Sequence, residues 1–213
     1  MSRLDVAPET AAEAEACLSD DERQRARRYR HDRDRRRFVV ARGRLRQLLG
    51  ERLGVPPAAV ELACGRNGKP ALAPRFAGSG WRFNVSHCGE IALYALSRRR
   101  EVGVDVEAVR VLEEGDEIAR RFFSRREVAA YRALAPRDRP LGFFNCWTRK
   151  EAFVKALGVG LSLHLERFDV SLAPGEPARL LRIERGLSER AGWRLAAFSP
   201  LPGYVAALAS RPE

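Results

Sequence analysis

The fold is decided by the stretch Trp147-Thr148-Arg149-Lys150-Glu151-Ala152-Phe153-Val154-Lys155-Ala156-Leu157-Gly158. It predicts one helix with an inward-packing face of aromatic and aliphatic residues, and Gly158 is a typical helix end. Glu151 and Lys155 are four residues apart, so they lie side by side on one face. A carboxylate and an ammonium at this spacing are most often a surface ion pair, so the helix alone does not indicate a site.

A second stretch, Glu101-Val102-Gly103-Val104-Asp105-Val106-Glu107, alternates as a strand does. Asp105 and Glu107 share one face with Gly103, and the valines occupy the other face. Two neighbouring carboxylates repel each other, and a divalent cation is a natural compensation. A pair of acids at the exposed end of a strand is the alternative, and this segment leaves both open.

The chain is long enough to bury a core. Its 213 residues are 45% hydrophobic, which fits one domain of moderate size or two small halves. No apolar run approaches the roughly 18 residues of a membrane helix, and the N-terminus lacks the pattern of a secretion signal. We therefore expect a cytoplasmic protein without a membrane segment.

The charge favours anionic partners. The formal net charge is +11, and among the 39 basic residues only Lys69, Lys150 and Lys155 are lysines. Such a charge suits phosphorylated cofactors, acidic proteins or nucleic acid. The four cysteines and three histidines show no metal-ligand spacing, so a zinc site is not expected.

Caps and turn residues predict the remaining elements, except in residues 1–18, which carry no clear signal. Capping boxes at Ser19 and Ser124 open helices, and Gly54 ends another. Besides the helix above, which Pro140 opens, the expected helices are 20–30, 34–53, 116–123 and 125–134. The expected strands are 59–63, 70–72, 81–85, 91–97, 101–107, 168–172, 179–184, 193–197 and 204–209.

The order of these elements repeats weakly along the chain. A long helix precedes strands that close with 91–97, and a second long helix precedes strands that close with 204–210. We therefore predict an α+β fold of two similar halves, 1–100 and 101–213. Each half would pack a long helix on a small antiparallel sheet, related by a pseudo-twofold axis, with the active site between them.

The acids of the strand and the helix form one candidate site. Asp105, Glu107 and Glu151 suit Mg²⁺, which keeps several waters and takes few protein carboxylates. Lys155 lies one turn beyond Glu151, where it can stabilise charge on a transferred phosphoryl group. These residues predict a magnesium-dependent enzyme that acts on a phosphoryl group.

The first half supplies further candidates for binding phosphate. Arg37 and Arg42 flank the apolar stripe of the helix 34–53, where they point into a cleft or into water. Lys69 follows the turn signal Asn67-Gly68, and Ser86 and His87 are expected at the tip of a strand. A lone histidine in a hairpin is otherwise unremarkable, so the sequence leaves both interpretations open.

Five motifs in this order resemble the 4'-phosphopantetheinyl transferases of the Sfp type, the pseudo-dimeric single-chain class. The resemblance extends from about Arg23 to Ala209, nearly the whole chain. The motifs are Gly68-Lys69-Pro70, Phe83-Asn84-Val85-Ser86-His87, Val102-Gly103-Val104-Asp105-Val106-Glu107, Arg121-Phe122-Phe123-Ser124 and the stretch from Trp147 to Lys155.

The resemblance implies the reaction. The 4'-phosphopantetheine arm of coenzyme A moves to a serine of an acyl, peptidyl or aryl carrier protein, and adenosine 3',5'-bisphosphate is released. Mg²⁺ would bridge to the coenzyme A pyrophosphate. Carriers of fatty-acid, polyketide and nonribosomal-peptide synthesis all fit the implied reaction.

The resemblance also implies residue roles. Asp105, Glu107 and Glu151 match the metal-binding acids of the family, and Glu151 is the first candidate to accept the serine proton. Lys155 matches a pyrophosphate-binding lysine. The residues that match the nucleotide end or its basic surroundings are Lys69, Ser86, His87, Arg25, Arg37 and Arg42, with His87 meeting the 3'-phosphate.

The expected partner is an acidic carrier protein, which a basic enzyme attracts electrostatically. We expect contact near 122–134 and at the helix end after Lys155, in a monomer. Two alternatives compete. A magnesium-dependent nuclease usually carries an acid-x-lysine triplet, which is missing here, and a basic nucleic-acid-binding protein would leave the clustered acids unexplained.

Overall fold

The computed structural model describes residues 1–65, 69–158, 163–184 and 192–211. Its elements follow one order twice: a strand, then helices of which the last is long, then four strands. The α-helices are α1 (Pro8–Ala16), α2 (Asp20–Arg27), α3 (Asp32–Leu53), α4 (Gly115–Phe122), α5 (Arg125–Ala133) and α6 (Arg139–Leu157). The strands of the first half are β1 (Ser2–Arg3), β2 (Leu62–Cys64), β3 (Pro70–Leu72), β4 (Trp81–Cys88) and β5 (Ile91–Arg98). Those of the second half are β6 (Val102–Ala108), β7 (Phe168–Val170), β8 (Leu180–Ile183), β9 (Arg194–Phe198) and β10 (Tyr204–Ser210).

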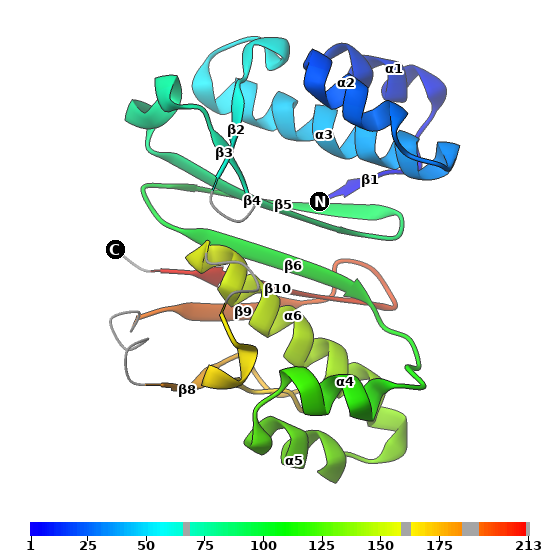
Figure 1. Ribbon diagram of the computed structural model, residues 1–213, viewed down its shortest axis with the longest axis vertical. Helices are drawn as coiled ribbons and strands as arrows, with labels where there is room; N and C mark the ends of the chain where they lie inside the picture. The colour runs from blue at the N-terminus through cyan, green and yellow to red at the C-terminus, as the bar shows by residue number, and fades with distance from the viewer. Residues whose placement is uncertain (66–68, 159–162, 185–191, 212–213) are drawn as a thin grey trace.

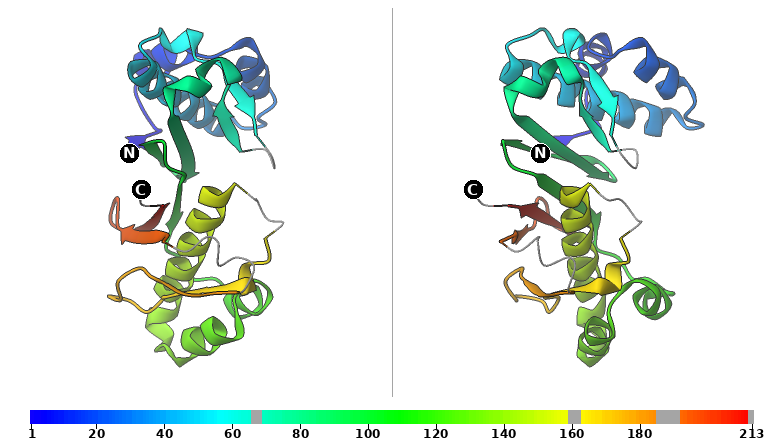
Figure 2. Two further views of the ribbon diagram at one scale, coloured as in Figure 1. Left: turned by 90° about the vertical axis from the view of Figure 1, so that its left-hand side faces the viewer. Right: turned by 60° about the vertical axis from the view of Figure 1, so that its left-hand side comes forward.

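The sheets repeat the same order. The first half forms a sheet β1-β5-β4 and a ribbon β2-β3, and the second half forms β6-β10-β9 and β7-β8. Within each sheet and ribbon the strands pair antiparallel. One half lies above the other, with α1 to α3 at one end and α4 and α5 at the opposite end (Figure 1, Figure 2). The predicted α+β fold with two similar halves is confirmed.

Each long helix begins and ends for local reasons. In α3, Asp32 and Asp34 lie in the first turn and Arg52 in the last, which complements the helix dipole. Gly54, with φ 68°, ends it. In α6 a proline lies in the first turn and Gly158, also at φ 68°, ends the helix. These ends agree with the caps expected from the sequence.

The α6 helix lies directly on β6. Phe153, which is fully buried, packs edge-on against Phe168 at 4.9 Å between ring centroids, so its truncation to alanine would cost about 3–5 kcal/mol. A Cβ on Gly103 of β6 would collide with the Ala152 carbonyl oxygen and the Ala156 nitrogen. Only glycine therefore lets the helix approach this closely, and the approach brings Glu151 and Lys155 over the acids of β6.

Side chains of β4 join the two halves. Asn84 Oδ1 accepts a hydrogen bond from the Val104 N–H at 2.8 Å, and Cys88 Sγ accepts one from the Ala108 N–H at 3.3 Å. The apolar side chains of β6 pack against those of β5 in one core cluster. The Val104 and Ala108 N–H groups are thus bonded by side chains, which sets the register of β4 against β6 without a backbone ladder between them.

Several local expectations needed correction. Residues 1–18 contain β1 and α1, whose pairing with distant elements no local signal reveals. The strand expected at 59–63 begins later, because the 3-10 turn Pro57–Ala59 extends to its first residue and β2 starts only at Leu62. The β4 strand continues to Cys88, since the turn is made by Gly89 at φ 56°. Ser86 and His87 therefore lie within a strand, not at its tip.

Two predicted helix caps are confirmed, and one predicted turn lies outside the residues that the structure describes. The capping boxes of Ser19 with Glu22 and of Ser124 with Glu127 are both formed. The Asn67-Gly68 turn lies outside the described residues. Among the described helices, none is long and apolar enough to cross a membrane.

Candidate active site between the two halves

An ion pair between α6 and β6 marks the candidate site. Lys155 Nζ lies 2.6 Å from Asp105 Oδ1, and it also donates to Ser86 Oγ at 3.2 Å. Ser86 in turn donates to Asp105 Oδ1 at 2.8 Å. The lysine side chain is 29% exposed and the aspartate side chain 5%. Three elements from both halves thus hold one positive and one negative group at the junction.

The carboxylates of Asp105, Glu107 and Glu151 are only partly compensated by positive charge, because the pKa of each is raised although Lys155 lowers it. Burial raises the pKa of Asp105, and Lys155 acts in the opposite direction. Burial and the charge of Asp105 raise the pKa of Glu107. Burial also raises the pKa of Glu151, with Lys155 lowering it and the two other acids raising it further. The predicted acids are therefore close enough to repel one another.

Among the residues that the structure describes, two buried carboxylate oxygens have no hydrogen-bond partner. Asp105 Oδ2 and Glu151 Oε1 are buried and make no hydrogen bond, which is costly for a charged group. Within the described ranges, no group of three or more His, Cys, Asp or Glu side chains stands ready to hold a metal ion. The acids are near one another and under-compensated, but they are not yet arranged as a coordination shell.

A cavity of about 220 Å³ lies on the first half. Arg25 and Arg42 lie over the ring of Phe38, at 5.3 and 5.8 Å from its centroid, and the Tyr29 ring is 5.3 Å from it. Aromatic faces flanked by guanidinium groups suit a planar ring that carries phosphate. The cavity is lined by Arg25, Tyr29, Phe38, Ala41, Arg42, Leu45, Pro70, Val85 and His87.

His87 lines this cavity from β4. Its pKa is lowered, first by burial and then by the positive charges of Lys155, Arg42 and Arg25. The free protein therefore holds a neutral imidazole among cations. A phosphate beside it would favour the protonated form instead.

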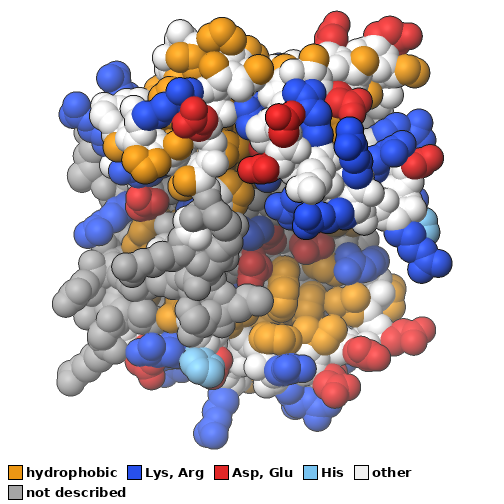
Figure 3. Space-filling view, turned by 45° about the horizontal axis from the view of Figure 1, so that its top comes forward, with side chains coloured by type: hydrophobic (Ala, Val, Ile, Leu, Met, Phe, Trp, Pro, Cys, Tyr) orange, Lys and Arg blue, Asp and Glu red, His pale blue; other side chains and the backbone are white. Residues whose placement is uncertain are grey.

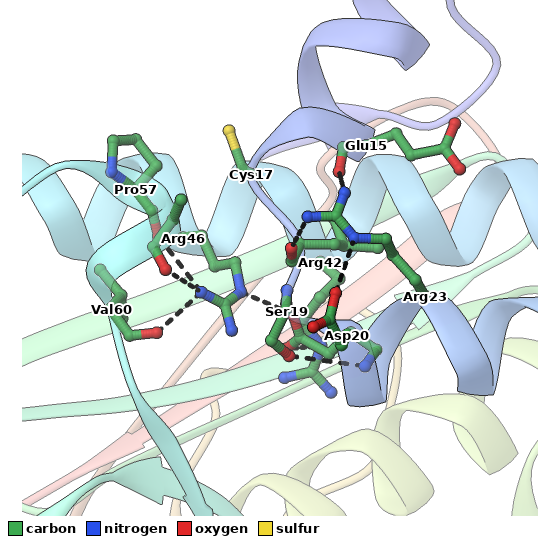
Figure 4. A network of polar contacts seen from close by, with 12 residues as sticks. Glu15, Cys17, Ser19, Asp20, Arg23, Arg42, Arg46, Pro57 and Val60 are labelled. Atoms are coloured by element: carbon green, nitrogen blue, oxygen red, sulfur yellow. Dashed lines mark hydrogen bonds and ion pairs between the residues drawn. The ribbon is translucent and has the colours of Figure 1, made fainter.

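Glu22 holds the arginines beneath the cavity. Its carboxylate lies 3.4 Å from Arg42 Nε and 2.5 Å from Arg46 Nε. In Figure 4 the Arg46 guanidinium points to the main-chain oxygens of Pro57 and Val60, at 3.2 and 2.7 Å. Arg46 is thus structural, and Glu22 orients Arg42 toward the cavity.

Charge is unevenly distributed over this face. In the space-filling view, Lys and Arg side chains gather on the upper part, above acidic side chains that lie deeper in the middle (Figure 3). Arg25 and Arg28 are exposed and line an open groove, which adjoins the cavity at Arg25 and Tyr29. A phosphorylated ligand would therefore meet cations at one end and carboxylates at the other.

Two of the candidates from the sequence are engaged elsewhere. Arg37 donates to both oxygens of Asp5, at 2.7 and 2.5 Å, and does not line the cavity. Lys69 donates to the main-chain oxygens of Lys155 and Val102, at 2.6 and 3.4 Å. The predicted contact of Arg37 with the cofactor therefore stays a prediction, because the structure pairs its charge with Asp5 outside this cavity.

The sequence reasoning missed Tyr29 and Pro70, which line the cavity. A signal was available for part of this cavity, since Phe38 and Arg42 are four residues apart on one face of α3, whereas Tyr29 follows the end of α2 at Arg27. Nothing local indicates that Tyr29 meets this face. Asn84 and Cys88 were missed as well, because their role depends on β6 lying alongside β4.

The structure thus combines a cavity flanked by guanidinium groups with a group of buried acids beside a lysine. The family model described as 4'-phosphopantetheinyl transferase superfamily matches residues 101–209, and the model of the 4'-phosphopantetheinyl transferase N-terminal region matches residues 6–99. This chain belongs to the 4'-phosphopantetheinyl transferase superfamily. The resemblance found in the motifs is thereby confirmed.

Similar proteins carry the same name. The 4'-phosphopantetheinyl transferase HetI of Nostoc is 40% identical over 194 residues, which are 91% of this chain and 78% of that protein. A 4'-phosphopantetheinyl transferase of Bacillus subtilis is 32% identical over 158 residues, 74% of this chain and 67% of the relative. The Helicobacter pylori holo-[acyl-carrier-protein] synthase in complex with coenzyme A covers 51% of this chain and 96% of its own, with TM-score 0.37 and 22% identity. The enzymes of this family are transferases that move phosphopantetheine from coenzyme A to carrier proteins.

Proposed function

We propose that this chain transfers the 4'-phosphopantetheine arm of coenzyme A to a serine of an apo carrier protein, with Mg²⁺ as the metal. Adenosine 3',5'-bisphosphate is the other product. The observation that carries the proposal is the pair of buried, unpartnered oxygens of Asp105 and Glu151 beside the Lys155 ammonium. A cation would bind the free carboxylate oxygens, and a pyrophosphate would bind the Lys155 ammonium. The serine hydroxyl of the carrier would approach the same place.

The acids fit the implied metal. Mg²⁺ takes only a few protein carboxylates and fills its shell with water and phosphate oxygens, and Asp105 Oδ2 and Glu151 Oε1 are available for it. Glu107 would complete the set, since the charge of Asp105 raises its pKa and the charges of both acids raise the pKa of Glu151. The metal would supply charge stabilisation for the phosphoryl group and its leaving group.

Coenzyme A would bind across the cavity and the acids beside Lys155. The adenine nucleotide end would occupy the cavity over Phe38, with Arg42, Arg25 and His87 around its phosphate. The pyrophosphate would lie toward Lys155 and Ser86, which are already joined by a hydrogen bond of 3.2 Å. This path places the bond to be broken at the junction of the two halves.

Two side chains would act on the transferring group. Lys155 brings a positive charge to the oxygens on which charge develops. Glu151 is our candidate to accept the serine proton, through a carboxylate oxygen that the metal would leave free, because burial raises its pKa. A Glu151→Gln variant that still binds magnesium separates the two roles of Glu151: an unchanged pH–rate profile would exclude the base role.

The proposed partner is an acidic carrier protein. Arg125 and Arg126 are exposed at the start of α5 and follow the partly buried Phe122, so they offer charge next to an apolar contact. Charge reversal at both arginines should raise the KM for the carrier and leave the KM for coenzyme A unchanged. We further propose a monomer of two domains, 1–100 and 101–213, acting in the cytoplasm.

The test is the intact mass of a purified apo carrier incubated with this protein, coenzyme A and magnesium. A gain of one phosphopantetheine arm, abolished by EDTA and by Asp105→Ala, establishes the reaction and the metal together. No gain with acyl, peptidyl and aryl carriers would overturn the proposed reaction for these substrates. Coenzyme A binding, measured in the same preparation, then shows whether the cofactor site survives without the chemistry.

A further inference from the structure

Lys69 joins the first half to the end of the helix that carries Lys155. Its Nζ donates to the Lys155 carbonyl oxygen at 2.6 Å and to the Val102 carbonyl oxygen at 3.4 Å. The side chain is half-buried, and burial lowers its pKa. The Lys69 ammonium thus donates its hydrogen bonds to main-chain carbonyl oxygens of the protein itself.

The contact supplies a hydrogen-bond donor to a carbonyl oxygen in the last turn of α6. The last carbonyls of a helix lack partners within it, and a cation is favourable there because it complements the helix dipole. In α6, the Gly158 N–H reaches Val154 O at 3.1 Å and Lys155 O at 3.3 Å. Lys69 adds a charged donor to the same Lys155 oxygen, from an element far away in the chain.

The backbone and the side chain of Lys155 are thereby held from two sides. Its carbonyl oxygen is bonded by Lys69, while its ammonium meets Asp105 and Ser86. We infer that Lys69 is a positioning residue, which fixes the last turn of α6 so that the Lys155 ammonium stays aimed at the reacting phosphate. This assignment differs from the nucleotide-end role that the motif alone implied.

The position of Lys69 also connects the cavity with the acids beside Lys155. Lys69 immediately precedes Pro70, which lines the cavity beside Phe38 and begins β3. The hairpin is closed next to Lys69, because the Gly65 N–H donates to the Lys69 carbonyl oxygen at 2.8 Å. A nucleotide in the cavity therefore contacts the same short hairpin that holds the helix end.

Two variants separate a positioning role from a ligand role. Lys69→Met keeps the length of the side chain and removes its donors, whereas Lys69→Arg keeps charge and donors. Arg75→Met is the matched control, because it removes one charge from an exposed residue just beyond β3 that contacts Glu61, Ala59 and Phe76 and not α6. The part that concerns turnover rests on the proposed function.

The first readout is hydrogen exchange of the Gly158 amide without any ligand. We expect about tenfold faster exchange in Lys69→Met, since one charge-assisted hydrogen bond to the last turn is lost, and recovery in Lys69→Arg. Arg75→Met should exchange like the unchanged protein. Unaltered exchange in Lys69→Met would overturn the inference, and this result stands whether or not the protein modifies a carrier.

The second readout divides turnover from affinity. We expect kcat to fall about tenfold in Lys69→Met, because a misplaced group slows the chemical step, while affinities for coenzyme A and 3'-dephospho-coenzyme A change less than about twofold. Weaker coenzyme A binding with unchanged kcat would instead identify Lys69 as a direct ligand. If the unchanged protein modifies no carrier, the proposed function fails and the exchange result alone decides the role of Lys69.

Discussion

Two lysines of one helix are predicted to have opposite roles. Lys150 is fully buried and all of its three donors are used, on Glu127 Oε2 at 2.8 Å and on the carbonyl oxygens of Leu165 and Phe168 at 2.8 and 2.6 Å. Lys155, by contrast, is partly exposed at the candidate site. We expect Lys150→Met to destabilise the fold and Lys155→Met to remove activity.

The magnitude follows from what remains after the substitution. Lys150→Met leaves the Glu127 carboxylate, whose side chain is 2% exposed, without its counter-charge. Breaking a buried pair in this way costs about 3–5 kcal/mol. For a chain of this size the melting temperature should fall by about 6–20 °C. Thermal unfolding followed by circular dichroism and by calorimetry measures this shift.

Two controls sharpen the interpretation. Lys155→Met should lower the free energy of unfolding by less than Lys150→Met does, because the Lys155 side chain is 29% exposed whereas that of Lys150 is fully buried. A Glu127→Gln, Lys150→Met double variant should regain part of the lost stability, because both buried charges are then removed while a side-chain oxygen remains to accept from the main-chain N–H of Ser124 or Val170. A Lys150→Met protein that melts within about 2 °C of the unchanged one would refute the reasoning.

Three further outcomes are expected. Asp105→Asn should lower kcat at least about hundredfold and weaken magnesium dependence, measured by titrating the metal in the transfer assay. His87→Gln should weaken binding of coenzyme A but not of 3'-dephospho-coenzyme A. The pKa of His87 is lowered in the free protein, and a bound 3'-phosphate would favour the protonated imidazole. The affinity for coenzyme A, divided by the affinity for 3'-dephospho-coenzyme A, should therefore fall as pH rises. Titration calorimetry at several pH values measures this ratio. Gly103→Ala should destabilise the protein by about 1–3 kcal/mol in denaturant unfolding, because the new methyl group meets the Ala152 carbonyl.

The local features of the fold were predictable. Gly54 and Gly158 end their helices, and Ser19 and Ser124 open theirs through capping boxes, as the sequence indicates. Each of these signals is read within one helical turn. The alternation in β6 likewise assigned Asp105 to the strand face that α6 covers.

The partners of the polar side chains were less predictable. The sequence suggested that Arg37 contacts the cofactor, but in the structure its guanidinium donates hydrogen bonds to Asp5, which lies 32 residues earlier in the chain. Lys69 reaches across 86 residues to the Lys155 carbonyl. Which cation pairs with which anion depends on how the whole chain folds, and the residues next to each charged group in the sequence do not indicate its partner.

The sequence by itself determined the helix ends, the strand alternation, the repeat of two halves and the family. Those features depend on residues close together in the chain or on motifs in a fixed order. Only the tertiary structure decided that Lys155 pairs with Asp105, that β4 and β6 are joined by side chains, and that Lys69 holds the end of α6. Burial and close approach create these contacts, and both arise only when distant segments pack together.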